Sequence, residues 1–379
     1  MRRDRRHPLW AKLMVIVGAV LLLSSGTALA GASVLLKRYD ENITRVDLLP
    51  PDESEEEPGS DITGPLNILL AGLDTRPSRP EEPPRADVMI IVHVPADMRS
   101  AYLISLPRDT LVDIPPFEPT GYLGQQRVKL NGAMAEGSRQ QPGEELPDIA
   151  RGFQLLSQTI SNLTGIERFD AGAVINFTGF TDIVDAMDGV TVELDEVIVS
   201  RHRQPDGRHR PVLADGSGYF GPQMVYEPGT PPCGPADDKG RFTCELNGWQ
   251  ALDVARQRYG VEDGDYGRQR HQQVILEAML DKAISRDVVT NPLALDRVLR
   301  AAGDALLFDG RGHRPVDFAF ALRHLRPGDL VTVQVDAVSV HVGGVYRGEQ
   351  LNPRTFELFE ALREDRLAEF LLNNRDLVS

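Results

Sequence analysis

The 379-residue sequence is poor in cysteine and lysine, and it lacks the common catalytic motifs. Two cysteines without suitably spaced histidines cannot form a four-ligand zinc site. We find no G-x-x-x-x-G-K-S/T loop, no H-E-x-x-H helix and no G-x-S-x-G elbow. The sequence therefore gives no indication of a P-loop enzyme, a zincin protease or a serine hydrolase of the elbow type. The formal charge of −15 argues against a general nucleic-acid binder, which would need a basic surface.

The composition is that of a folded chain, with 41% apolar and 26% charged residues, and this excludes a wholly disordered or polytopic membrane protein. Its charge is unevenly placed. Residues 1–38 carry seven bases and one acid, a net of +6, so the remainder carries −21. Only five of the 41 basic residues are lysines, so the chain is rich in guanidinium groups, which suit phosphate best.

The N-terminal region predicts a membrane anchor. Residues 13–36 carry no charge over 24 positions, whereas a membrane-spanning helix needs about 20. The basic tail at residues 1–12 favours a cytoplasmic N-terminus. The alternative is a signal peptide cleaved after Ala30. Both interpretations export the rest of the chain, and we predict a single-pass cell-membrane protein with an extracytoplasmic catalytic domain.

Beyond the anchor, we predict an acidic linker at 37–63, a catalytic domain at 64–308 and a C-terminal region at 309–379 that completes or extends it. Mixed strands and helices indicate an α/β or α+β domain with a central mixed, largely antiparallel sheet. Residues 201–242 are rich in Gly, Pro, Arg and His, which predicts a long surface insertion. The periodicity predicts strands at 66–71, 86–94, 101–106, 171–176, 190–194 and 330–338, and helices at 149–163, 178–187, 247–259, 266–285, 292–306, 316–325 and 353–370.

The two cysteines lie 11 positions apart within or beside this insertion. In an exported domain we predict that Cys233 and Cys244 form a disulfide. The alternative is two unpaired thiols.

Acidic and basic side chains follow three predicted strands. Asp74 follows the first, Asp87 opens the second, and Arg108 and Asp109 follow the third. If these strands are neighbours, the four groups meet at one edge of the sheet. Two close carboxylates repel each other unless a cation such as Mg²⁺ lies between them. The alternative is that Asp74 caps a turn and Asp87 pairs with Arg85 on the surface.

A second polar group lies at the junction of two predicted helices. Arg268 and Gln272 share a helix face near a helix start, where free backbone N–H groups favour an anion. The alternative is a solvated charged face with Asp265 as a helix cap. Together with the carboxylates, this group indicates a site for a diphosphate or a phosphodiester. Its members are Arg256, Arg258, Asp265, Arg268, Arg270 and Gln272.

Six segments in this order resemble the LytR–CpsA–Psr family of cell-envelope glycopolymer phosphotransferases, in its actinobacterial form. They are NILLAGLDTR (67–76), RADVMIIVHV (85–94), LISLPRDTLVDIP (103–115), VKLNGAMAEG (128–137), INFTGFTDIVDAMDGVTVEL (175–194) and LNGWQALDVARQRYGVEDGDYGRQRHQQ (246–273). The resemblance implies a three-layer α/β/α domain with an apolar pocket for a polyprenyl chain. It also implies transfer of a phosphoglycosyl polymer from a polyprenyl diphosphate carrier to peptidoglycan.

The resemblance also implies roles for individual residues. Asp74 and Asp87 would bind Mg²⁺ (or Mn²⁺), and Asp265 would orient the arginines. This chain departs from the family pattern at His271, where a second arginine is common, and in the 201–242 insertion. The residues that would hold the diphosphate or its supporting network are Arg85, Arg108, Arg256, Arg258, Arg268 and Gln272.

We therefore expect an acceptor hydroxyl to attack the sugar-side phosphorus, with Asp87 or Asp109 as the general base. Two alternatives use the same site: an exported polyprenyl-diphosphate hydrolase with water as acceptor, and a non-catalytic envelope-binding or regulatory module. The motifs do not name the polymer.

Overall fold

The computed structural model describes residues 44–50, 62–75, 79–204, 224–257, 260–262, 265–283, 306–322 and 324–378, with isolated residues between these ranges. The predicted tail, the membrane segment at 13–36 and most of the acidic linker lie outside this part. Among the helices of the described part, none is long and apolar enough to cross a membrane.

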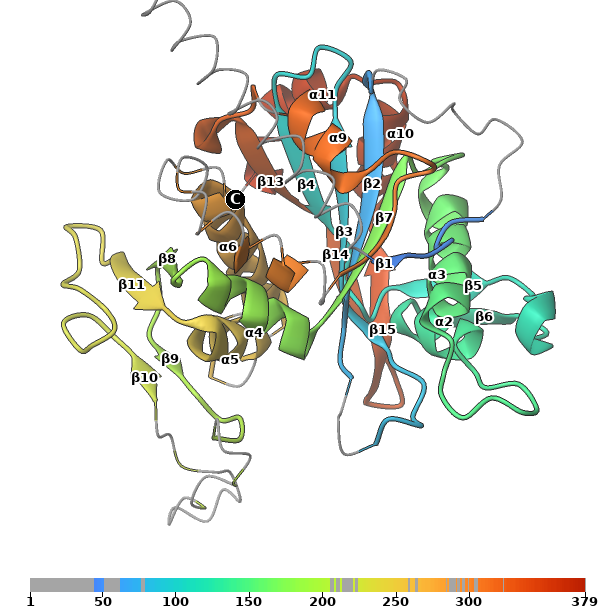
Figure 1. The fold of residues 1–379 in the computed structure, drawn as a ribbon, viewed down its shortest axis with the longest axis horizontal. Helices are drawn as coiled ribbons and strands as arrows, with labels where there is room; N and C mark the ends of the chain where they lie inside the picture. Colours follow the sequence, from blue (N-terminus) through green and yellow to red (C-terminus); the bar gives the residue numbers. More distant parts are fainter. Residues whose placement is uncertain are drawn as a thin grey trace, which may run out of the picture. The chain divides into compact units, whose positions relative to one another are not determined.

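A seven-stranded sheet forms the centre of the described chain (Figure 1). Three of its strand pairings are parallel and three are antiparallel, so the sheet is mixed but not largely antiparallel. Strands predicted at 66–71, 86–94, 101–106 and 171–176 all belong to it. Its order is β1 (Thr44–Arg45), β12 (Leu306–Asp309), β7 (Ala171–Asn176), β2 (Leu66–Leu73), β3 (Ala86–Val94), β4 (Ala101–Ser105) and β13 (Leu330–Gln334).

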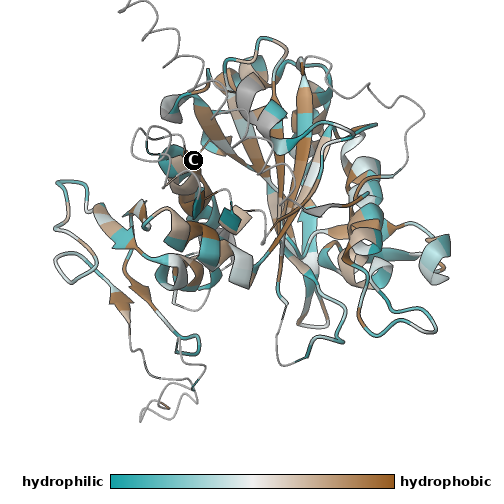
Figure 2. Cartoon of the chain, in the orientation of Figure 1, coloured by the Kyte–Doolittle hydropathy of each residue, from teal (hydrophilic) through white to brown (hydrophobic). Residues whose placement is uncertain are grey.

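The central strands are apolar along most of their length (Figure 2). Because side chains alternate along a strand, both faces of the sheet are apolar, and helices cover both. Leu69 and Met89 point into the largest core, where Phe153 and Leu156 of α3 (Ile149–Thr164) meet them. Gly172 in β7 allows this close contact, since a Cβ there would lie 2.7 Å from the Phe153 ring. This core also includes residues of α2 (Asn131–Gly137), α10 (Pro353–Arg363) and α11 (Leu367–Asn373).

The opposite face carries α4 (Phe177–Ala186), α5 (Gly248–Arg256) and α6 (Asp265–Ala283) (Figure 1). These helices share a second core with β8 (Val190–Leu194) and β11 (Phe242–Leu246), which pair in antiparallel orientation. Asn247 caps α5 as predicted, because its side chain accepts the Gln250 N–H at 3.0 Å and the Gln250 side chain accepts in return.

The predicted surface insertion is partly core. Tyr226, in the short β10 (Val225–Tyr226) that pairs with β9 (Ile198–Val199), is fully buried, and its hydroxyl donates to Asp253 at 3.1 Å. Cys233 and Cys244 form a disulfide in the structure. With a sequence separation of 11, this link stabilises the fold by about 3 kcal/mol through loop closure.

The C-terminal region differs from prediction at two places. The strand predicted at 330–338 is divided into β13 and β14 (Ala337–Val342), and β14 pairs with β15 (Val345–Leu351). Gly343 and Gly344 both adopt positive φ in the connecting turn, which suits a tight hairpin. The helix predicted at 353–370 is divided into α10 and α11. Asp365, with φ of 53°, lies just after the end of the first of them.

The remaining described elements are the hairpin β5 (Leu111–Ile114) with β6 (Gln125–Lys129), the short helix α9 (Pro315–Ala321), and the 3₁₀ turns Glu118–Thr120, Pro327–Asp329 and Arg375–Leu377.

Candidate functional site

The polar groups predicted at three strand ends do meet, and a β-bulge helps to place them. Gly72 pairs with Val88 and Leu73 pairs with Ala86, so Asp87 is the extra residue of a bulge in β3. Bulges redirect a side chain, and they are frequent beside active sites. One position further along, the Asp74 N–H donates to the Arg85 carbonyl at 3.2 Å. The two carboxylates thus occupy adjacent strand ends.

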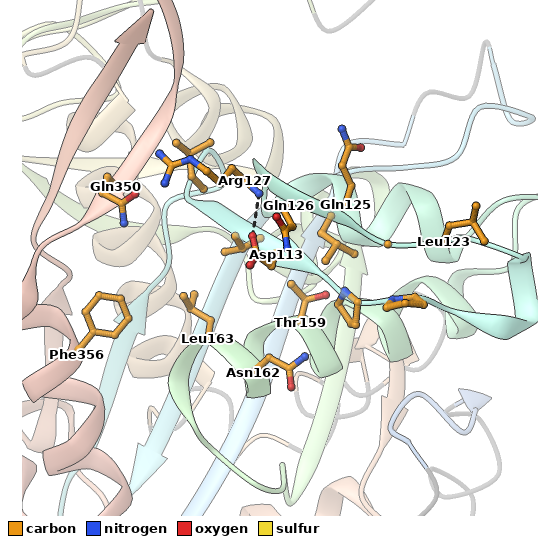
Figure 3. Close-up of a pocket in the computed structure, with 16 residues that line it drawn as sticks. Asp113, Leu123, Gln125, Gln126, Arg127, Thr159, Asn162, Leu163, Gln350 and Phe356 are labelled. Carbon is orange, nitrogen blue, oxygen red and sulfur yellow. Dashed lines mark hydrogen bonds between the residues drawn. The ribbon is translucent and has the colours of Figure 1, made fainter.

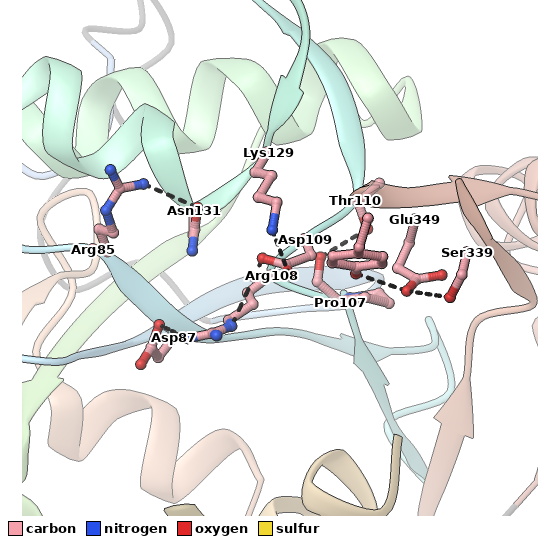
Figure 4. Close-up of polar contacts among 11 residues, drawn as sticks. Arg85, Asp87, Pro107, Arg108, Asp109, Thr110, Lys129, Asn131, Ser339 and Glu349 are labelled. Atoms are coloured by element: carbon pink, nitrogen blue, oxygen red, sulfur yellow. Dashed lines mark hydrogen bonds and ion pairs between the residues drawn. The ribbon is translucent and has the colours of Figure 1, made fainter. Parts of the chain in front are cut away.

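Arg108 links the carboxylates of Asp87 and Asp109 (Figure 4). Its Nη1 donates to Asp87 Oδ1 at 2.7 Å, and its Nε lies 3.8 Å from Asp109 Oδ1. The Arg108 side chain is 19% exposed and that of Asp87 is 17% exposed, so the pair faces the surface without being fully solvated. The alternative pairing of Asp87 with Arg85 is wrong, because Arg85 Nη1 instead donates to Asn131 Oδ1 at 3.4 Å.

Lys129 and Asn131, which the sequence reasoning missed, complete the inner network (Figure 4). Lys129 Nζ donates to Asp109 Oδ2 at 2.8 Å. One signal was present in the sequence: Lys129 is one of only five lysines in an arginine-rich chain. Asp109 is therefore held between two cations.

A further missed group comes from the β14–β15 hairpin. The Tyr346 ring lies under Lys129 Nζ, which is 4.7 Å from the ring centroid. The Tyr346 hydroxyl donates to Glu349 Oε1 at 2.8 Å, and the Ser339 hydroxyl donates to the same oxygen at 2.9 Å. Burial, and then the nearby carboxylates of Glu349 and Asp109, raise the pKa of Tyr346 well above its usual range. The β14–β15 hairpin of the C-terminal region thus packs against Lys129 and Asp109.

Arg256, the last residue of α5, approaches the carboxylates from the helical layer. Its Nη2 lies 4.0 Å from Asp74 Oδ1, and its guanidinium lies 4.3 Å from the centroid of the Phe177 ring. Gln272 of α6 donates to the Ala255 carbonyl at 3.1 Å and so ties α6 to the end of α5.

The remaining members of the second predicted group are Arg268, Arg270, Asp265 and Arg258. Arg268 is only 4% exposed, and Arg270 contacts Glu196 at 3.4 Å. Asp265 begins α6, but its side chain, like the whole of Arg258, lies outside the described residues.

An apolar cavity of about 220 Å³ lies between the sheet and the helices α4, α5 and α6. Arg256 and Gln272 line it together with Asn176, and Arg256 also reaches Asp74, so the cavity adjoins the strand-end network. Such a site suits a molecule with an apolar chain and an anionic head. The apolar lining comes from Leu70, Ala71, Gly72, Val88, Ile90, Ala173, Ile175, Phe177, Phe180, Leu252, Ala255, Ile275, Leu276, Met279 and Leu306.

A larger open groove of about 910 Å³ lies along the β5–β6 hairpin (Figure 3). Phe356 of α10 and Gln350 of β15 line one side, and Gln126 and Arg127 of β6 line the other (Figure 3). The Phe356 ring is 44% exposed. Amide side chains beside an exposed ring form a surface that suits a sugar.

Asp74 and Asp87 supply the kind of ligand atom that a hard divalent cation takes. Their carboxylate oxygens are the ligands that Mg²⁺ takes. Their side chains are 21% and 17% exposed, so water can complete the coordination.

Comparison with known proteins agrees with this geometry. The model of the LytR_cpsA_psr family matches residues 39–363. This chain belongs to that family.

Curated LytR_cpsA_psr relatives are similar over much of the chain. The cell wall biosynthesis protein LcpA of Corynebacterium glutamicum is 24% identical over 90% of the chain. TagU of Enterococcus faecalis, a polyisoprenyl-teichoic acid–peptidoglycan teichoic acid transferase, is 28% identical over 65% of it. The chain spans 62% and 61% of the lengths of these two relatives. TagU of Bacillus subtilis is 22% identical over 96% of the chain and 99% of its own length.

Solved LytR_cpsA_psr structures share the fold. TagV of B. subtilis superimposes with a TM-score of 0.53 and 19% identity, covering 80% of this chain and 98% of TagV. TagT bound to LIIa-WTA gives a TM-score of 0.51 and 22% identity, with 83% and 94% covered. At this identity the similarity concerns the α/β fold with its mixed central sheet.

Proposed function

We propose that this chain transfers a phosphoglycosyl polymer from a polyprenyl diphosphate carrier to peptidoglycan, with Mg²⁺ as cofactor. The apolar cavity that ends at Arg256 beside Asp74 carries this proposal. It offers an apolar lining for part of a polyprenyl chain, and Arg256 among its lining residues would bind the diphosphate. The printed names of the TagU relatives, polyisoprenyl-teichoic acid–peptidoglycan teichoic acid transferase, support the same chemistry.

In the proposed reaction the acceptor hydroxyl oxygen bonds to the sugar-side phosphorus while the bond to the polyprenyl phosphate oxygen breaks. Arg108 and Arg256 would bind the diphosphate oxygens, and the Coulomb attraction of such a charge pair at about 4 Å is on the order of 4 kcal/mol at an effective dielectric near 20, before the cost of desolvation. Either Asp87 or Asp109 would take the hydroxyl proton. Mg²⁺ bound by Asp74 and Asp87 would offset charge on the leaving phosphate.

The test uses the purified full-length chain with a polyprenyl diphosphate-linked glycan, peptidoglycan and Mg²⁺. The expected product is peptidoglycan that carries the glycan through a phosphodiester. Release of free glycan phosphate with no wall-linked product would identify a hydrolase instead, and bound carrier without turnover would identify a binding module.

Removal of the metal should abolish the reaction. A chelator is expected to lower turnover below about 1% of its starting rate, because electrostatic stabilisation of the leaving phosphate is lost. Excess Mg²⁺ or Mn²⁺ should restore it. An Asp87→Asn variant should need a higher Mg²⁺ concentration for half-maximal rate. Full turnover in chelator would contradict the cofactor proposal.

We further propose that the groove beside Phe356 binds the peptidoglycan acceptor. Phe356→Ala is expected to raise KM for peptidoglycan about 3- to 10-fold, since one aromatic contact contributes about 0.5–1.5 kcal/mol. The rate at saturating acceptor should change little. Leu372→Ala, at a 67% exposed position in α11, is the matched control. An unchanged KM in the Phe356 variant would move the acceptor site elsewhere.

We also propose that residues 13–36 form a membrane anchor. It would hold the catalytic domain on the outer side of the cell membrane, near its lipid-linked substrate. Fractionation of cells should recover the chain with the membrane, and added protease should digest it in spheroplasts. A chain recovered in the cytosol would contradict this placement.

A further inference from the structure

A second polar cluster lies away from the strand-end network, where β8 ends beside α6. Asp195 and Glu196 directly follow β8, and His271 lies on α6. Each residue offers one ligand atom, and these atoms all lie within 4.8 Å of one another. None of the three lines the apolar cavity or the acceptor groove.

His271 is the unusual member of this cluster. It is 2% exposed, and within the described part of the chain neither ring nitrogen makes a hydrogen bond. A buried polar group without a hydrogen bond is costly, so its position calls for a ligand. Its Nε2 lies 3.4 Å from Glu196 Oε1 and thus faces the carboxylates.

The imidazole is in the form that binds metals. Burial, and next the positive charge of Arg270, lower the pKa of His271 to about 4. At neutral pH, and down to about pH 4, the ring therefore remains uncharged and keeps a free lone pair.

The carboxylates leave negative charge for a cation to offset. Glu196 Oε2 accepts the Glu262 N–H at 2.7 Å, and Oε1 lies 3.4 Å from Arg270 Nη2. Asp195, Glu196 and Arg270 together carry a formal charge of −1. Burial raises the pKa of Glu196, and the charges of Asp195 and Glu262 add to that effect. A bound cation would offset the net negative charge of this group and the cost of burying the Glu196 carboxylate.

We propose that Asp195, Glu196 and His271 bind a divalent transition metal, with Zn²⁺ as the best match. Two carboxylate oxygens and one imidazole nitrogen leave a fourth position for water, which the exposed side chain of Asp195 keeps open. In a tetrahedral zinc site with bonds near 2.0 Å, neighbouring ligand atoms are roughly 3.3 Å apart. The distance of 3.4 Å between His271 Nε2 and Glu196 Oε1 agrees with this geometry. The imidazole distinguishes the site from an all-oxygen Mg²⁺ site.

This metal would tie the end of β8 to α6, whose next residue, Gln272, lines the apolar cavity. Bound there, the metal would stabilise the helix that forms one wall of the cavity. The proposal stands on the three side chains and does not depend on the transfer reaction.

The experiment uses the full-length chain, stripped with a chelator and then titrated with Zn²⁺. One equivalent should bind, measured by calorimetry and by metal analysis after dialysis. Zn²⁺ at about 100 times its Kd should raise Tm by about 4 °C. Co²⁺ in the same site should show d–d absorption bands.

Two variants test the ligands. His271→Arg replaces the ligand with a cation that can pair with both carboxylates, and Glu196→Gln removes a charged ligand while keeping the shape. Both should lower zinc affinity at least 10-fold and remove the Co²⁺ bands. His324→Ala, at an exposed histidine, should bind zinc as the unaltered chain does.

The proposal is overturned if the unaltered chain binds less than one equivalent, or if His271→Arg or Glu196→Gln binds zinc as tightly as the unaltered chain. Circular dichroism of each stripped variant shows whether it is folded. If one variant unfolds, the other gives the result.

Discussion

Replacing Arg108 with alanine is expected to lower transfer of a lipid-diphosphate glycan by about 100- to 1,000-fold, the range found when one preorganised electrostatic contact to a transition state is removed. Arg108 is the group that joins Asp87, at 2.7 Å, to Asp109, at 3.8 Å. Its loss removes a phosphate ligand and also leaves the two carboxylates without their shared cation. The measurement is the rate of wall-linked product formation at saturating substrates.

Matched variants separate this effect from a general loss of charge. Arg108→Lys keeps the charge but loses the planar, two-pronged geometry, so it should recover only part of the rate. Arg139→Ala removes an arginine whose side chain is 58% exposed and paired with Glu136, and it should leave the rate unchanged. Near-normal turnover in Arg108→Ala, with thermal unfolding as in the unaltered chain, would refute the assignment of this site.

Filling the apolar cavity should have a comparable effect on binding of the carrier. Val88 lines the cavity one position after Asp87, and its side chain is partly exposed. Val88→Trp places a large ring where the first isoprene unit would lie. At roughly 0.8 kcal/mol per buried carbon, displacing one five-carbon unit costs about 4 kcal/mol, or about 1,000-fold in Kd. Binding of a polyprenyl diphosphate to the purified chain measures this loss.

Val88→Ala is the control, because it enlarges the cavity and should keep binding within about 10-fold. The tryptophan is compatible with a strand, so Tm of Val88→Trp should stay near that of the unaltered chain. Tight binding by a folded Val88→Trp variant would mean that the carrier lies elsewhere.

Much of the strand-end network was predictable from local pattern. Short apolar runs bounded by turns predicted the strands that carry Asp74, Asp87 and Arg108. Their adjacency was an expectation, since consecutive strands commonly pair, and the sheet confirms it. The pattern could not show that Asp87 occupies a bulge, because a bulge depends on the register of two paired strands.

The supporting groups were not predictable in the same way. Tyr346 and Glu349 reach Lys129 and Asp109 from a hairpin more than 200 residues away in sequence. The predicted strand at 330–338 joins β13 to the first two residues of β14, because Val-rich alternation continues across the Gln334–Ala337 junction, and no strand was predicted for the rest of that hairpin. The insertion at 201–242 was misjudged for a related reason. A Gly- and Pro-rich stretch suggests surface, yet Tyr226 is buried by residues from other parts of the chain.

By itself, the sequence determined the strands and helices around the site, the family and the acidic and basic residues at the strand ends, since each of these depends on residues close together in the chain. The tertiary structure alone decided which charges pair, that the apolar cavity ends at Arg256, and that His271 faces Glu196 across 75 positions of sequence. Those pairings depend on sheet order and on helix packing against the sheet. Such long-range contacts are set by the burial of whole faces rather than by any local pattern.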